Sequence, residues 1–333
     1  MKIALFGSKD FDSLEYHFSD SFQNLEHDVF HLDITDIFPL KYTYFYWGTK
    51  LFPQLNTNIF RNAAKKIIAN KPDLVICTYR FIHPVCIQII KKELPNIPVI
   101  HFNPDALTTF ENQQIFASPY DFYFTKDPYI VDFMKLKMGL NTYYLPESFN
   151  PKVHKKPDVN RLELEELTNI DVLTFGYLYP YRINMVEKLI DAGINVTLFG
   201  NKPRQFFKHK LDKYFANEYI TGARKSELLY GAKIVFNNFH YAEIESVNCK
   251  FFEIVGIGAF QICDYRSTVD EYSIIPSAEF TYKTIDKAIE QIKYYLDKPM
   301  LRHEMAEKQY NHFIQHHTYE HRVKQLLATV FRS

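Results

Sequence analysis

Short apolar runs alternate with helix-like segments along the first 150 residues. "KIALFGS", residues 2–8, is an apolar run that ends in glycine, and residues 11–27 then show helical periodicity before the strand-like "DVFHLDIT". The same alternation continues to about residue 149, with strands expected at "PDLVICTYR", "IPVIHFNPD", "YDFYFTKD" and "TYYLPESF" and helices around 57–70, 83–93 and 128–138. This spacing predicts a parallel, doubly wound α/β sheet.

The pattern breaks at residues 150–168, where prolines and charged residues replace the apolar periodicity, as is typical of a linker. A second alternation follows. Strands are expected at "IDVLTFGYLY", "INVTLFGN", "YITGAR", "KIVFNNF" and "GAFQICD", and helices at 182–192, near 225–231 and near 247–256. The C-terminal part is expected to be helical. We therefore expect two Rossmann-like domains that face each other across a cleft, over residues 1–155 and 165–333, with the terminal helices in the second.

Composition narrows the class of protein. The chain has 333 residues, of which 47% are apolar, so both domains can have a core. Its 39 Lys and Arg equal its 39 Asp and Glu, so no global field attracts nucleic acid. The N-terminus lacks a signal-peptide pattern, and no run of about 18 apolar residues indicates a membrane span.

The four cysteines are scattered without C-x-x-C spacing, which favours reduced core residues in a cytoplasmic protein. Two segments that mix basic and aromatic residues, 41–52 and 204–215, could line an acceptor groove or contact the inner face of a membrane peripherally. Ordinary packing is the alternative reading of both.

Glycines end three of the predicted strands, at Gly7, Gly176 and Gly200. In open α/β sheets, ligands bind beyond the carboxyl ends of the strands, where a glycine turn lets a phosphate approach the backbone. The first strand does not continue as G-x-G-x-x-G, so a nicotinamide-dependent dehydrogenase is not expected.

The segment "ESVNCKFFEIVGIGAF", residues 245–260, carries two glutamates with seven residues between them. Glu253 lies early in a predicted helix, and its carboxylate could accept hydrogen bonds from two vicinal hydroxyls of a ribose or a sugar. Gly258 would end that helix in a left-handed cap. The alternative is that Glu245 and Glu253 are surface residues flanking an amphipathic helix.

Other strand ends offer further candidates. Arg182, at the start of a helix after Gly176, could bind a leaving diphosphate, or it could be a solvated helix residue. Asp105 could orient or deprotonate an acceptor hydroxyl, or cap a turn beside a proline. Asn238 and His240 end the "KIVFNNFH" strand near the expected donor pocket, where a histidine can equally be structural.

No metal site is expected. Asp10 and Asp12 form a D-x-D, but directly after the first strand they fit turn and N-cap chemistry for the first helix. His316 and His317 are adjacent and would point to different faces of a helix, and no H-E-x-x-H occurs.

The glutamate segment, extended to "ESVNCKFFEIVGIGAFQICD", resembles the E-x7-E and following glycine of retaining family 4 glycosyltransferases, which have the GT-B fold. Together with "FGYLYPYR", "KIVFNNFH", "KFFEIVGIGAF" and "HHTYEHRVKQLL", it is still more similar to the CgeB-like, spore-maturation-type branch. The resemblance covers residues 170–330. The chain departs from the family pattern at Ser246, where glycine is usual, and at Cys249 and Lys250.

The resemblance implies a metal-independent, hexosyltransferase-like enzyme without cofactors. It would transfer a sugar from a nucleotide donor, expected to be a UDP-sugar, to an unknown acceptor hydroxyl, with retention. The second domain would bind the donor, with the ribose on Glu253 and the sugar near Glu245, and the first domain would bind the acceptor. A nucleotide-sugar epimerase and a non-catalytic sugar-binding or scaffold protein of the same fold remain alternatives.

Resemblance and strand-end positions together define the expected site. The catalytic candidates are Glu245, Arg182 and Asp105. The donor-binding candidates are Gly176, Tyr177, Arg182, Gly200, Asn238, His240, Lys250, Glu253 and Gly258.

Overall fold

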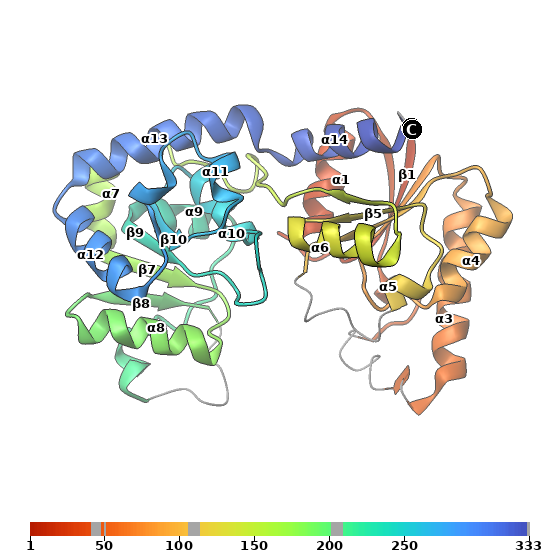
Figure 1. Ribbon diagram of the computed structural model, residues 1–333, viewed down its shortest axis with the longest axis horizontal. Helices are drawn as coiled ribbons and strands as arrows, with labels where there is room; N and C mark the ends of the chain where they lie inside the picture. The colour runs from red at the N-terminus through yellow and green to blue at the C-terminus, as the bar shows by residue number, and fades with distance from the viewer. Residues whose placement is uncertain (41–47, 50, 106–113, 201–208, 332–333) are drawn as a thin grey trace. The chain divides into compact units, whose positions relative to one another are not determined.

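The computed structural model describes residues 1–40, 48–49, 51–105, 114–200 and 209–331 (Figure 1). The chain divides into two compact α/β units. The first comprises Met1–Glu147, Ala242–Ile244 and Tyr319–Ser333, and the second comprises Ser148–Tyr241 and Glu245–Thr318. Among the described residues, no helix is both long enough and apolar enough to cross a membrane.

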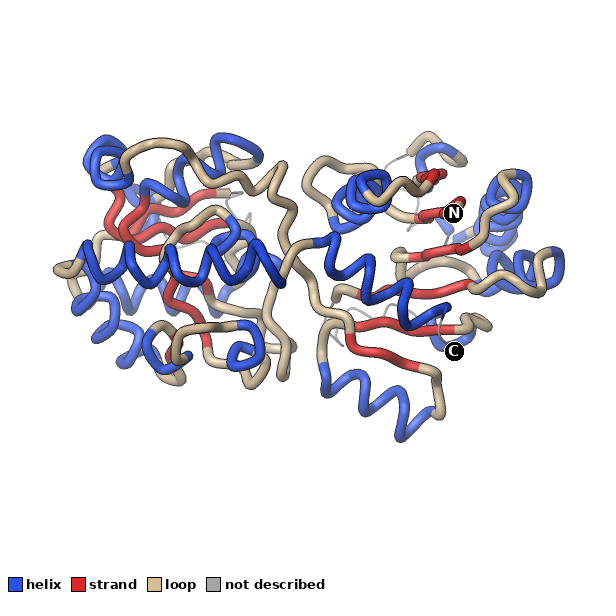
Figure 2. The backbone as a smooth tube through the Cα atoms, turned by 90° about the horizontal axis from the view of Figure 1, so that it is seen from above, coloured by secondary structure: helices blue, strands red, loops and turns tan. Residues whose placement is uncertain are grey.

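The first unit contains a parallel six-stranded sheet in the order β2-β1-β3-β4-β5-β6. Its strands are β1 (Lys2–Phe6), β2 (Asp28–Leu32), β3 (Leu74–Cys77), β4 (Val99–Asn103), β5 (Phe122–Thr125) and β6 (Thr142–Tyr144). Its helices are α1 (Leu14–Asn24), α3 (Pro53–Ala69), α4 (Pro84–Glu93), α5 (Gln114–Ala117), α6 (Pro128–Asp132) and α14 (Tyr319–Phe331). Figure 2 shows these strands as a layer between helices, with both termini in this unit.

The period-2 pattern of the strands decides which helices cover which face of this sheet. In β1, Ala4 and Phe6 pack with α3 and α4, whereas Ile3 and Leu5 pack with α1 and α14. Successive strand residues point to opposite faces, so a strand that is apolar at every position must be covered on both. All four side chains are at most 1% exposed, as a doubly wound sheet requires.

The terminal helix α14 differs from the expectation that it belongs to the second domain. Tyr319, Val323, Leu326 and Val330 are buried in the cluster that contains Ile3 of β1. Their spacing of three to four residues forms one apolar helix face, which covers the first sheet beside α1. The helix follows α13 (Pro299–His316) in the chain, but its apolar face is buried in the first unit.

The second unit contains a parallel five-stranded sheet in the order β11-β10-β9-β7-β8. Its strands are β7 (Ile170–Phe175), β8 (Val196–Phe199), β9 (Ala232–Asn237), β10 (Gln261–Asp264) and β11 (Thr281–Tyr282). Its other helices are α7 (Arg161–Thr168), α8 (Pro180–Asp191), α9 (Gly222–Gly231), α10 (Cys249–Gly256), α11 (Val269–Tyr272) and α12 (Ile285–Leu296). One buried cluster joins α7, α9 and α10 to β7 and β9.

Two local predictions for this half were wrong. The expected linker contains α7, whose N-cap Asn160 accepts a hydrogen bond from the Leu162 backbone at 3.0 Å and whose Leu164 is buried. A helix of only eight residues between prolines and charges gives a weak periodic signal. "YITGAR" contains no strand, because α9 already begins at Gly222.

Three of the four cysteines are core residues, as predicted. All four are free; Cys77 of β3, Cys86 of α4 and Cys263 of β10 are buried, whereas Cys249 of α10 is only partly buried.

Candidate functional site

The order of the second sheet indicates where a ligand would bind in that unit. β8 lies on one side of β7, while β9, β10 and β11 follow on the other, so the strand order reverses between β7 and β9. In doubly wound sheets, ligands bind outside the carboxyl ends of the strands at such a switch point. Gly176 and Tyr177 follow β7, and Asn238 and His240 follow β9, so four predicted donor-site residues surround this point.

Gly176, Gly200 and Lys250 lie together at this edge. Gly176 has φ of +94°, and a Cβ added there would lie 2.5 Å from the Lys250 ammonium nitrogen. Gly200 has φ of +116°, and its Cβ would lie 2.7 Å from the Gly176 carbonyl oxygen. Only glycine fits both positions without strain, because each combines a left-handed conformation with a close neighbour.

Lys250 is held in this place by the end of β7. Its Nζ donates a hydrogen bond to the Phe175 carbonyl at 2.5 Å and lies 4.8 Å from the centre of the Phe175 ring. Lys250 is the second residue of α10, after the N-cap Asn248, whose side chain accepts from the Phe251 backbone N–H at 3.1 Å. A glycine turn, an ammonium group and a helix N-terminus therefore meet at one point, which is suitable chemistry for a phosphate.

Arg182 is neither solvated nor directed at an open site. It is 7% exposed, and its guanidinium donates to the carbonyls of Asn238 at 2.7 Å and Tyr177 at 3.1 Å. Its Nε also contacts the Tyr181 hydroxyl at 3.2 Å. The side chain thus joins the β7–α8 loop to the end of β9, and its role at a diphosphate stays a prediction.

Glu253 lies in a buried polar group within the second unit. Its carboxylate is 3.2 Å from the Lys225 Nζ and 3.9 Å from the His154 Nε2. The His154 Nδ1 accepts from the Asn150 backbone N–H at 3.1 Å, and its Nε2 lies 3.3 Å from the Lys225 Nζ. The carboxylate is therefore held in place by an ion pair with a buried lysine.

Lys225 and His154 were not among the predicted site residues. Lys225 is 4% exposed on α9, and His154 is 1% exposed in the loop before α7. A lysine within the apolar pattern of a short helix is the one signal in the sequence that could have indicated a buried partner.

The helix cap predicted at Gly258 is confirmed. Gly258 has φ of +79° and follows the last turn of α10, and its N–H donates to the Val255 carbonyl at 2.8 Å. Its own carbonyl accepts from Arg161 at 3.0 Å, so the turn is also connected to α7. These contacts are structural, and a role for Gly258 at the donor stays a prediction.

Glu245 lies in the loop before α10 and is half-buried. Its backbone carbonyl accepts from the Thr268 hydroxyl at 2.6 Å. Burial, followed by the negative charge of Glu245, raises the pKa of Glu271. The charge of Glu245 thus disfavours ionisation of Glu271 in the same unit. The catalytic role of Glu245 stays a prediction.

In the first unit, Asp105 forms an ion pair with Arg80, and its backbone carbonyl accepts from the Asn103 side chain at 2.9 Å. Its side chain is 42% exposed. The aspartate is thus partly neutralised but open to solvent at the end of β4, which is compatible with either the acceptor or the turn-capping reading.

A buried ion cluster in the first unit was not predicted. Lys126, at the end of β5, is 5% exposed, and its Nζ lies 2.7 Å from a Glu147 oxygen and 2.8 Å from a Glu243 oxygen. Burial raises the pKa of Glu147 to about 7, although the charge of Lys126 partly opposes this. Glu243 belongs to the short segment Ala242–Ile244, and neither its burial nor its partner could be inferred from local sequence.

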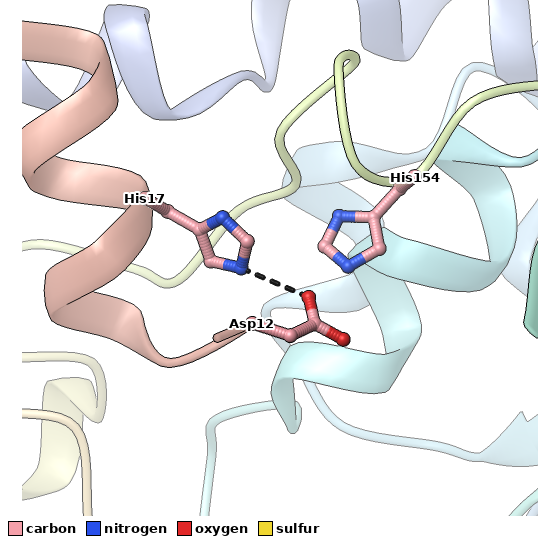
Figure 3. A group of neighbouring side chains, drawn as sticks. All are labelled: Asp12, His17 and His154. Carbon is pink, nitrogen blue, oxygen red and sulfur yellow. Dashed lines mark ion pairs between the residues drawn. The ribbon is translucent and has the colours of Figure 1, made fainter. Parts of the chain in front are cut away.

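The predicted N-cap of the first helix was misplaced by a few residues. Ser13 caps α1, with its hydroxyl accepting from the Tyr16 backbone N–H at 3.2 Å, while the Asp10 carbonyl accepts from the Ser13 N–H in the preceding turn. Asp12 has φ of 66° and pairs with His17 of α1 at 3.1 Å (Figure 3). His154, also labelled there, belongs to the second unit.

Within either unit taken separately, the described residues contain no cluster of three His, Cys, Asp or Glu side chains at ligand spacing. Most of segment 41–52 and residues 204–208 of the second segment lie outside the described residues. In the described part of the second segment, Leu211 and Phe215 are buried. The acceptor or membrane contacts of both segments stay predictions.

Comparisons with known proteins support the predicted class. Residues 182–328 match a family model described as "Glycosyl transferase-like". The chain is 23% identical over 195 residues to spore protein CgeB of Bacillus subtilis (strain 168), a match that covers 54% of this chain and 58% of the relative. The match thus spans little more than half the length of that protein, and it agrees with the resemblance seen in the sequence.

Solved structures match over the whole length. Sucrose-phosphate synthase from Thermosynechococcus elongatus is similar with a TM-score of 0.71 at 12% identity, covering 99% of this chain and 98% of that chain. The galactosyltransferase WaaB of the lipopolysaccharide outer core gives 0.63 at 13% identity, covering 100% and 99%. T4 phage BGT, solved with its UDP-glucose substrate, gives 0.55 at 13% identity, covering 100% and 99%.

At these identities the structural matches establish the fold. The chain has two Rossmann-like α/β domains with the GT-B fold, as predicted from its sequence.

Proposed function

We propose that this protein is a glycosyltransferase that transfers a sugar from a nucleotide-sugar donor, a UDP-sugar, to an acceptor hydroxyl. The observation that carries the proposal is the β7/β9 switch point of the second unit, where Gly176, Lys250 and the start of α10 meet. The family model begins at residue 182, so it covers β9 and α10 of this unit.

In this proposal the diphosphate lies against the Gly176 turn. Negative charge grows on the leaving diphosphate as the glycosidic bond breaks, and a fixed cation at that point stabilises the transition state more than the ground state. Lys250 supplies the cation and the N-terminus of α10 supplies partial positive charge. Both are in place before the donor binds, because Lys250 is already bonded to the Phe175 carbonyl.

Glu253 binds the ribose hydroxyls of the nucleotide in this scheme. Its ion pair with Lys225 fixes the position of the carboxylate. Glu245 acts near the donor sugar, and the first unit binds the acceptor, with Asp105 available to orient its hydroxyl. The reducing compartment expected from four free cysteines is consistent with an enzyme that uses a cytoplasmic nucleotide sugar.

Calorimetric titration with UDP tests the donor site. Glu253→Gln and Lys250→Met should each weaken UDP binding by about ten-fold or more, since each removes a charge-assisted hydrogen bond of about 1.5–3 kcal/mol. Glu290→Gln and Lys287→Met are matched controls, because both residues are exposed on α12 and pair with each other. UDP binding that is unchanged in both site variants would contradict the assignment.

We further propose that transfer requires no divalent metal and retains the anomeric configuration. Lys250 and the α10 N-terminus take the place that a metal would have at the diphosphate. T4 phage BGT has also been solved with UDP and Mn²⁺, so the point needs direct measurement. Turnover should survive excess EDTA, and an α-linked donor should give an α-linked product by NMR. Loss of activity that Mn²⁺ restores would contradict the first part, and a β-linked product the second.

A further inference from the structure

Five aromatic rings form a continuous cluster at the carboxyl ends of β7 and β9. We name this cluster the aromatic platform; its members are Tyr177, Tyr179, Tyr181, His240 and Tyr241. Neighbouring ring centres lie 4.3–6.0 Å apart, from His240–Tyr241 at the short end to Tyr179–Tyr181 at the long end. These are the separations of rings in direct contact.

Three members of the aromatic platform are open to solvent. Tyr177 is 54% exposed, Tyr179 is 38% exposed and Tyr241 is 70% exposed. Their hydroxyl groups have no hydrogen-bond partner among the described residues. Exposed aromatic side chains that gather in one place mark binding sites more often than isolated ones do.

The remaining contacts hold the platform in a fixed shape. The Tyr181 hydroxyl donates to the Phe239 carbonyl at 2.9 Å. The buried guanidinium of Arg182 lies 5.7 Å from the Tyr179 ring centre and 6.0 Å from that of Tyr181, and it also bonds the Tyr177 carbonyl. Arg182 thus supports the rings from the protein side, so a ligand would meet a preformed surface.

The platform borders the proposed donor site. Tyr177 directly follows Gly176, and His240 and Tyr241 follow β9, so the rings come from both strands of the switch point. The exposed members offer ring faces and hydroxyl groups. This chemistry does not suit a phosphate, but it suits an uncharged ring that has one apolar face and many hydroxyls.

We propose that the aromatic platform binds the ring of a sugar by stacking, with the tyrosine hydroxyls bonded to the hydroxyls of that sugar. The inference rests on the proposed function and adds a sugar subsite to it. A pyranose has C–H groups on its faces and hydroxyls at its rim, which matches this arrangement. The same chemistry is present in the sugar of the donor and in a saccharide acceptor.

The test compares ligands with and without a sugar ring. Binding of UDP, UDP-glucose, UDP-galactose and a set of neutral disaccharides is measured by calorimetry and by saturation-transfer NMR. Tyr241→Ala and Tyr177→Ala should weaken sugar-containing ligands about ten-fold, equal to about 1.4 kcal/mol, and change UDP binding less than two-fold. A loss confined to the UDP-sugars identifies the donor sugar, and a loss confined to disaccharides identifies the acceptor.

Two further variants serve as controls. Tyr219→Ala removes a tyrosine that is 69% exposed in the same unit and should change nothing. Tyr241→Phe keeps the ring and should retain most of the sugar affinity, whereas a purely hydroxyl-based contact would be lost. All variants should unfold at the same temperature as the wild type, since the replaced side chains are exposed.

Several outcomes would overturn the proposal. If the alanine variants lose equal affinity for UDP and UDP-glucose, the platform binds the nucleobase and not the sugar. If they bind every ligand as the wild type does, the platform residues are ordinary surface tyrosines. The proposal would also be contradicted if the wild type bound UDP-sugars no more tightly than UDP and bound no disaccharide. If UDP does not bind at all, the proposed donor site fails, while the disaccharide titrations still decide whether the platform binds sugar.

Discussion

The two units have the same kind of sheet but differ at the switch point. In each, the second strand of the unit lies on one side of the first strand and the remaining strands on the other, and a glycine follows that first strand. A Cβ added to Gly7 would lie 2.2 Å from the Thr78 hydroxyl and 2.5 Å from the Glu15 side chain. A Cβ added to Gly176 would lie against the Lys250 ammonium instead.

The environment of Gly7 is filled by the chain's own polar groups. Thr78 donates a hydrogen bond to Glu15, both side chains are buried, and burial raises the pKa of Glu15. An acidic side chain occupies this position, whereas an ammonium group lies at the corresponding position beside Gly176. The phosphate approach predicted at Gly7 is therefore not supported by its surroundings, and the comparison shows that topology selects the location of a site while side chains select its chemistry.

The largest effect is expected at Arg182. Arg182→Leu should lower the free energy of unfolding by about 3 kcal/mol, because the carbonyls of Asn238 and Tyr177 lose a buried charged donor. Denaturant unfolding measures it, and Arg224→Leu, at a 51% exposed position on α9, should change stability by no more than about 0.5 kcal/mol. A stable Arg182 variant that has lost UDP binding would instead favour the original assignment of Arg182 to the diphosphate.

The two switch-point glycines provide a direct comparison between the units. Gly7→Ala and Gly176→Ala should each lower stability by about 1–3 kcal/mol, the first by overpacking against Thr78 and the second through its positive φ and the displacement of Lys250. Only Gly176→Ala should also weaken UDP binding in calorimetry. Equal losses of UDP affinity in the two variants would remove the distinction between the switch points.

The smallest expected effect is on the pH dependence of stability, which should have opposite sign for a buried glutamate of the first unit and one of the second. Burial raises the pKa of Glu147 to about 7, so the folded state holds this proton more tightly than the unfolded chain, in which the pKa is near 4.5. The stability that results is complete below about pH 4.5 and is lost as the pH rises through about 7. Glu147→Gln should thus gain about 1 kcal/mol or more relative to the wild type between pH 5 and 8.

Glu165 of the second unit is the matched opposite case. Burial raises its pKa, but the His303 hydrogen bond and the charges of Arg302 and Arg161 outweigh burial and lower the pKa below its usual value. This carboxylate stabilises the fold above its unfolded pKa, and the contribution is lost as the pH falls through the folded pKa. Glu165→Gln should therefore destabilise most at neutral pH and least in acid. Parallel pH profiles of the two variants in urea unfolding would contradict the contrast.

Several features of the site were determined by the sequence itself. The alternation of apolar runs and amphipathic segments predicted both parallel sheets, because period 2 and period 3.6 are local properties of the chain. Gly258 was predicted as a left-handed helix cap and has φ of +79°, since the conformation depends on a helix end a few residues away. The motif around Glu253 also indicated the glycosyltransferase resemblance that the family model supports.

Tertiary structure alone decided which side chains meet. Helix α14 packs in the first unit, Lys126 pairs with Glu147 and Glu243, and Arg182 donates to the Asn238 carbonyl instead of facing solvent. Each contact joins segments far apart in the chain, and no local pattern encodes a partner 21 or 117 residues away. Short-range periodicity specifies the elements and their buried faces, whereas burial, charge and ring packing act on whatever the folded chain brings together.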